Sequence, residues 1–143
     1  MSRHRRCDRG SVVVEFALVV PLVLMILVGV VQYGYHYWAM QTAAASAREA
    51  ARRLVVGTDP TCTVAEAQDR AGGPAVGSTL PSVVYTFDNA TNTAERGALV
   101  TVTVTIQSLD MGLVPLPSGG VVTQSATNRV ENVPIDPLLC VAP

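Results

Sequence analysis

The stretch VVVEFALVVPLVLMILVGVV, residues 12–31, determines what kind of protein this sequence encodes. Its twenty residues contain one polar side chain, that of Glu15. As a helix they would be about 30 Å long, which matches the hydrocarbon core of a bilayer. The alternative is a buried helix of a soluble protein, but the rest of the 143-residue chain has too few large apolar side chains to enclose it. We therefore predict a membrane-spanning helix.

The flanks of this stretch predict its orientation. Tyr33, Tyr35, Tyr37 and Trp38 follow it directly, and such rings favour the headgroup region. Four arginines precede it within the first ten residues, whereas Arg48 would lie about 25 Å beyond its end on a continuing helix. Because basic residues close to a span stay on the cytoplasmic side, we predict a cytoplasmic N-terminus and an extracytoplasmic C-terminal part.

The composition excludes several classes of protein. With 49% hydrophobic and 15% charged residues the chain is not disordered, and 143 residues are too few for a multidomain enzyme. The net charge of −1 conceals a net +3 in residues 1–10 and a net −5 in residues 58–143. A clustered basic surface for nucleic acid is therefore not expected in the main part of the chain.

Glu15 is an acid inside the apolar stretch and needs an explanation. An ionised carboxylate at the centre of a span costs roughly 2.5 to 3.5 kcal/mol, and less near its end, so a partner is expected. If the chain were cut after Gly10, the new amino group of Ser11 would lie one helical turn from Glu15. Pairing with Glu15 of a neighbouring copy would set the register between subunits. The alternative is a side chain that extends to the membrane surface.

Residues 9–22, RGSVVVEFALVVPL, resemble the start of TadE-like pseudopilins, small membrane proteins of the tight-adherence (Tad, or Flp) pilus system. The resemblance implies cleavage by a prepilin peptidase between Gly10 and Ser11, which makes Glu15 the fifth mature residue and Phe16 the sixth. Residues 41–52, QTAAASAREAAR, resemble the alanine-rich continuation of the family. The sequence departs from the family at Gln32, where an acid is frequent.

This resemblance, which covers about residues 9–57, also implies a location and partners. The location is the inner (plasma) membrane, with incorporation into the pilus. The partners are the membrane itself, the prepilin peptidase, the major Flp pilin, a companion pseudopilin and the inner-membrane assembly platform. The function implied is that of a minor pseudopilin in the assembly of a pilus used for adhesion.

The helix is expected to continue beyond the membrane to residue 57, where Gly57 and the residues after it end it. Small side chains recur at every fourth position of this part: Ala39, Ala43, Ala47 and Ala51. Such a stripe lets helix backbones approach each other closely, the arrangement that packs transmembrane and juxtamembrane helices together. The alternative is that alanine, with its high helix propensity, only stiffens the stalk.

The remaining residues, 58–143, predict a small head. Thr63 to Glu66 fit a capping box that begins a short helix, and Gly72-Gly73 ends it. LVTVTVTI, residues 99–106, alternates β-branched residues with period two and is the clearest strand. Residues 82–87 and 121–130 are weaker strands of a three-stranded antiparallel meander.

We therefore expect an α+β fold, which the resemblance implies is pilin-like. Residues 1–10 are expected to form a cytoplasmic leader and residues 11–57 a transmembrane helix with its helical stalk. Residues 58–143 are expected to form the extracytoplasmic head, with a short helix and a three-stranded antiparallel sheet.

Cysteine positions predict one disulfide. Cys7 falls in the leader, whereas Cys62 and Cys140 bracket the head on the oxidising side of the membrane. We predict that Cys62 and Cys140 are bonded.

No catalytic pattern is found. The two histidines are too few and too far apart for a metal site, and there is no phosphate-binding loop or nucleophile elbow. We expect no enzyme, no cofactor, no metal and no small-molecule substrate. The main alternative to a pseudopilin is an uncleaved single-pass structural or adhesive surface protein. A secreted enzyme behind a signal peptide is a third possibility, against which the missing catalytic residues count.

Overall fold

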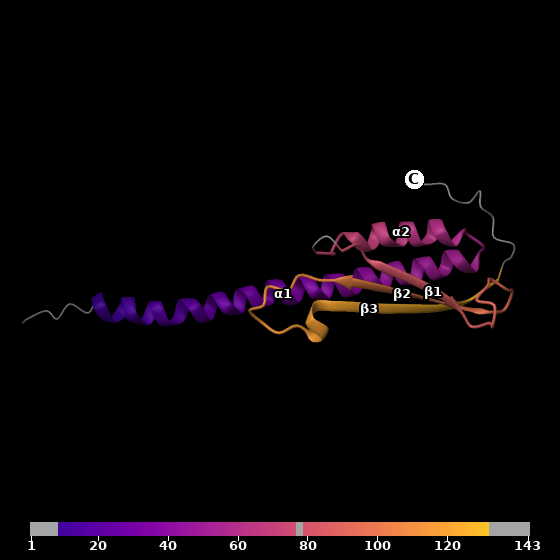
Figure 1. Ribbon diagram of the computed structural model, residues 1–143. Helices are drawn as coiled ribbons and strands as arrows, with labels where there is room; N and C mark the ends of the chain where they lie inside the picture. The colour runs from indigo at the N-terminus through magenta and orange to yellow at the C-terminus, as the bar shows by residue number, and fades with distance from the viewer. Residues whose placement is uncertain (1–8, 77–78, 132–143) are drawn as a thin grey trace, which may run out of the picture.

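The computed structural model describes residues 9–76 and 79–131. A long helix leads into a small head built from a second helix and three strands, so the predicted α+β class is confirmed (Figure 1). The elements, in chain order, are α1 Arg9–Val55, α2 Pro60–Gly72, β1 Ser82–Phe87, β2 Leu99–Gln107, the short 3₁₀ helix η1 Pro117–Gly120 and β3 Val121–Arg129.

Helix α1 has 47 residues and is therefore about 70 Å long. It continues through Pro21, which has no N–H, so the carbonyl of Ala17 lacks its usual intrahelical donor. The first part of α1 extends away from all other elements, while α2 and the sheet pack along its second part (Figure 1).

A Schellman motif ends α1 where the sequence predicts. Gly57 has a φ of 88°, a left-handed conformation that costs glycine little. The N–H of Thr58 donates to the carbonyl of Arg53 at 3.1 Å, and the N–H of Gly57 donates to Leu54 at 3.3 Å. These two bonds satisfy carbonyls that the helix end leaves free, and the chain turns back at once.

Helix α2 begins earlier than predicted, because Asp59 is its N-cap. The Asp59 carboxylate accepts hydrogen bonds from the N–H groups of Thr61 at 2.8 Å and Cys62 at 3.3 Å, while Pro60 occupies the first turn. Thr63 lies inside the helix, where its hydroxyl donates to the carbonyl of Asp59 at 3.0 Å. The predicted capping box at Thr63 was therefore wrong, since the Asp-Pro pair begins the helix one turn earlier.

The sheet is the predicted antiparallel meander, with β2 between β1 and β3. Tyr85 of β1 lies opposite Val102, which in turn lies opposite Ala126 of β3. Alternate residues of β2 are at most 1% exposed: Val100, Val102, Val104 and Ile106. The other face carries threonines, whose hydroxyls pair across the strands, as those of Thr101 and Thr127 do at 2.8 Å.

The buried face of the sheet and the second part of α1 form one core. The four alanines of the stripe are all 0% exposed within the single chain and belong to the same cluster as the β2 side chains: Ala39, Ala43, Ala47 and Ala51. Their short side chains let the α1 backbone approach its neighbours closely, and α1 contacts α2, β2 and β3. The head is thus folded onto the helix.

Candidate functional site: the free part of α1 and the loop at its end

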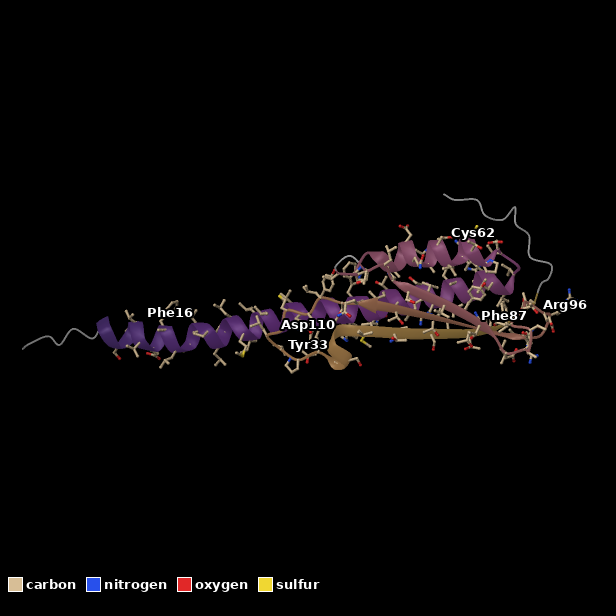
Figure 2. All side chains as sticks on the ribbon, viewed as in Figure 1. Phe16, Tyr33, Cys62, Phe87, Arg96 and Asp110 are labelled. Atoms are coloured by element: carbon tan, nitrogen blue, oxygen red, sulfur yellow. The ribbon has the colours of Figure 1, made fainter. Side chains whose placement is uncertain are left out.

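The free part of α1, residues 10–31, presents apolar side chains to its surroundings. Phe16 is 69% exposed and Leu18 is 73% exposed, and Phe16 projects from the free part in Figure 2. The helix is long and apolar enough to cross a membrane, and none of its most apolar window is buried. Apart from its last turn, no other described element covers this surface, so an apolar environment outside the chain suits it.

The residues of the predicted cleavage and assembly site lie at the beginning of α1. Gly10 and Ser11 are in its first turn, and Glu15 and Phe16 follow one turn later, all of them exposed. Among the residues that the structure describes, Glu15 takes part in no hydrogen bond or ion pair. Its carboxylate is therefore available to a group from another chain.

A loop covers the end of this free part. The β2–β3 loop, residues 108–116, returns from the sheet to contact α1 around Gln32. Gln32 is fully buried, and its Nε2 donates to Asp110 Oδ1 at 3.2 Å and to the carbonyl of Val114 at 2.9 Å. Both amide hydrogens are thus used, while Gln32 Oε1 has no partner among the described groups.

Two further contacts hold the same loop. The hydroxyl of Tyr33 donates to the carbonyl of Pro115 at 2.8 Å. A Cβ added to Gly29 would lie 3.6 Å from Val114 Cγ2, so the valine packs on the bare backbone of the helix. Tyr33 and Asp110 lie together at this junction in Figure 2. The loop is therefore anchored to the last turns of the apolar stretch.

One turn further along α1, His36 fixes the beginning of the loop. The ring is 7% exposed, and its Nδ1 lies 2.9 Å from Ser108 Oγ, which lies 2.9 Å from the carbonyl of Gly120. Because a carbonyl only accepts, the Ser108 hydroxyl gives its hydrogen to Gly120 and accepts from His36. Nδ1 therefore carries the hydrogen in this arrangement.

Sequence reasoning did not identify Gln32 and His36 as contacts of the loop. It treated Gln32 as a departure from the family, and His36 only as one of two histidines too far apart for a metal site. A signal was present, since both residues fall on the helical face that Ala39 and Ala43 continue, at the spacing of a buried stripe.

An ion-pair network joins the C-terminal part of α1 to α2. Arg53 contacts Glu49 of its own helix through Nε at 3.0 Å and Glu66 of α2 through Nη1. Glu66 also accepts from Arg70 at 2.7 Å. All four side chains are partly exposed, so the network orients the helices and contributes little stability. Its residues therefore have a structural role.

The predicted disulfide is only partly within the structure. Cys62 is disulfide-bonded, but Cys7 and Cys140 both fall outside the described residues. The pairing of Cys62 with Cys140 thus stays a prediction. Over residues 9–76 and 79–131, no group of three or more His, Cys, Asp or Glu residues could hold a metal ion.

Comparison with known proteins finds a similarity within α1. Residues 10–52 match the model of a family described as TadE-like protein. No curated protein and no solved structure matches the chain. The match starts at the predicted cleavage site and includes the free part of α1, the residues that hold the loop and the alanine stripe. Over residues 10–52 the chain is thus similar to TadE-like proteins, in agreement with the resemblance of its sequence.

Proposed function

We propose that this protein is a minor pseudopilin that takes part in the assembly of a Tad-type pilus. The free part of α1 anchors it in the inner membrane, with the leader in the cytoplasm and the head outside. One observation carries the proposal: a TadE-like helix exposes an apolar surface with one unpaired acid, Glu15, one turn after Gly10. Such a helix is suited to contact lipid before assembly and to contact other pilin helices in the pilus.

Local geometry favours cleavage between Gly10 and Ser11. The first N–H groups of a helix have no intrahelical acceptor, so unwinding the first turn breaks few hydrogen bonds. A Cβ added to Gly10 would have no atom within 4 Å, so the site is open. A prepilin peptidase therefore meets an accessible bond in the first turn of the helix.

After cleavage, Ser11 carries a free ammonium group close to the exposed Glu15 carboxylate. The two residues are about 6 Å apart along the helix axis and lie on one face. In an apolar environment, pairing across two copies removes two isolated charges at once and fixes the axial offset between helices. The major Flp pilin, a companion pseudopilin and the inner-membrane assembly platform are the partners of this surface.

The mature N-terminus tests the proposal. The full chain is expressed in membranes with and without the peptidase, and its intact mass and N-terminal sequence are measured. A terminus at Ser11 that depends on the peptidase is the expected result. A terminus at Met1 or Ser2 in both cases would favour the uncleaved surface protein, and a terminus near Ser46 would favour the secreted enzyme.

A further inference from the structure

The β2–β3 loop has an apolar exposed side. Its sequence is SLDMGLVPL, and within it Leu113 is 61% exposed and Met111 is 38% exposed. The charged residue of the loop, Asp110, is held by Gln32 and by the N–H of Gly112 at 2.8 Å. A single exposed leucine is ordinary on a protein surface. This loop exposes two large apolar side chains, and its one charged side chain is already hydrogen-bonded within the chain. That combination calls for a further explanation.

The place of the loop supplies that explanation. It is held at Gly29, Gln32 and Tyr33, which are the last turn of the apolar stretch and the residues directly after it. If residues 12–31 fill the hydrocarbon core, this level is the boundary between acyl chains and headgroups. The exposed side of the loop therefore continues the apolar surface of the free part of α1.

The opposite end of the head has the opposite character. The β1–β2 loop, residues 88–98, lies at the far end from this junction, where Figure 2 labels Arg96. Its exposed side chains are mainly polar or charged, among them Asp88, Thr91, Glu95 and Arg96. The head thus has a polar end directed away from the free helix and an apolar end beside it.

We propose that the β2–β3 loop inserts Leu113 and Met111 into the outer leaflet of the membrane that α1 crosses. The partner is the lipid bilayer, and the chain meets it at two places, the span and the loop. This inference rests on the proposed anchoring by α1. An amphipathic surface held at this level buries its apolar side chains about 5 to 10 Å deep, at the boundary of headgroups and acyl chains.

Quenching of tryptophan fluorescence by brominated phospholipids tests the insertion. The full chain carries Trp38→Phe and is reconstituted in phosphatidylcholine nanodiscs, with one new tryptophan in each variant. Leu113→Trp reports on the loop. Val84→Trp is the matched control, since Val84 is 55% exposed on the outer face of β1. Leu24→Trp, at a residue 54% exposed in the free part of α1, reports on the span.

The expected result is a roughly twofold loss of emission for Leu113→Trp with bromines near the headgroups, the depth of an interfacial segment. Leu24→Trp should be quenched best by bromines deeper in the bilayer, and Val84→Trp should not change. Quenching of Leu24→Trp without quenching of Leu113→Trp would overturn the loop inference and leave the anchoring in place. If neither is quenched, the proposed anchoring fails and the loop inference fails with it.

A second copy of the chain is the competing partner for Leu113. The measurement is therefore repeated at one chain and at several chains per nanodisc. Quenching at one chain per disc supports lipid contact. A blue-shifted Leu113→Trp emission that appears only with several chains per disc, without bromine quenching, would assign the surface to protein contact and overturn the proposal.

Discussion

At the scale of single residues, Gln32 and Glu15 are two polar side chains on α1 that differ in where they find partners. Gln32 finds its partners inside the chain, in Asp110 and Val114 of the β2–β3 loop. Glu15 finds none within the described residues and lies exposed near the beginning of α1. One residue therefore fastens the head to the helix, and the other is left for contacts between chains.

Replacing Gln32 should loosen the loop. Gln32→Leu has a similar volume but removes the donor to the partly buried carbonyl of Val114, and such a hydrogen bond contributes about 0.5 to 1.5 kcal/mol. Thermal unfolding of the full chain in detergent should show a lower Tm. Gln41→Leu is the matched control, because Gln41 is exposed on the same helix. Equal Tm values for both variants would contradict the role given to Gln32.

Replacing Glu15 should separate insertion from assembly. Glu15→Val removes a charge from the apolar stretch, so insertion into the membrane should persist, while pilus incorporation should fall because the pairing with Ser11 is lost. Incorporation is measured by immunoblotting of sheared pili. Val14→Ala, at an exposed neighbour, is the control. Normal piliation in Glu15→Val would remove the register role.

At the scale of elements, α1 does two things along one helix. Its first part exposes apolar side chains and has few contacts with other elements. Its second part buries a stripe of small residues under the sheet and α2. The alanine spacing predicted helix-to-helix packing as one of two explanations. In the structure the stripe is buried inside the same chain, in one core with the sheet as well as α2, and sequence spacing alone does not specify that partner.

Enlarging the stripe should therefore destabilise the head itself. Ala43→Leu places a larger side chain at a site with 0% exposure, and such overpacking costs about 1 to 3 kcal/mol. Ala45→Leu is the matched control, since Ala45 is exposed and both residue types favour helices. Urea unfolding of the full chain should show a lower midpoint for Ala43→Leu alone. Equal midpoints would favour an alanine stripe that only stiffens the helix.

At the scale of the whole molecule, the predicted Cys62–Cys140 disulfide would close the head. Cys62 lies in the first turn of α2 and is bonded, and Cys140 is its predicted partner. A bridge over so long a segment contributes up to about 4 to 5 kcal/mol in the chain-entropy model, and less in practice. The loss of residues 1–10 would remove Cys7, so this pairing is the one that a mature chain retains.

Non-reducing peptide mapping of the membrane-expressed protein tests the pairing. The expected result is one peptide that joins Cys62 to Cys140 and disappears on reduction. Cys140→Ser should release a free thiol at Cys62 and lower the Tm, whereas Cys7→Ser should change neither. A peptide that joins Cys62 to Cys7 would contradict the prediction.

The features that were predictable from sequence are those with a local period or a local signal. Strand β2 was predicted to within one residue at its end, because a half-buried strand alternates with period two. The end of α1 followed from Gly57. The start of α2 was missed because Asp59 and Pro60 also fit a helix end, and the sequence alone did not show that they end one helix and begin the next.

The loop contacts were out of reach for another reason. Gln32 and Asp110 are 78 positions apart, and no local pattern connects them. A glutamine after an apolar run reads as a surface residue unless the fold brings acceptors to it. Only the return of the β2–β3 loop to α1 reveals that Gln32 is buried.

The shared core of helix and head has a mechanical consequence. The alanine stripe joins α1 to the sheet beyond Pro21, and the β2–β3 loop contacts α1 at the junction between its free part and the head. Rotation or translation of this part of α1 therefore carries the head with it. If the free part lies in a bilayer as proposed, torque or pulling force applied there would pass through this shared core to the β1–β2 loop at the far end of the head.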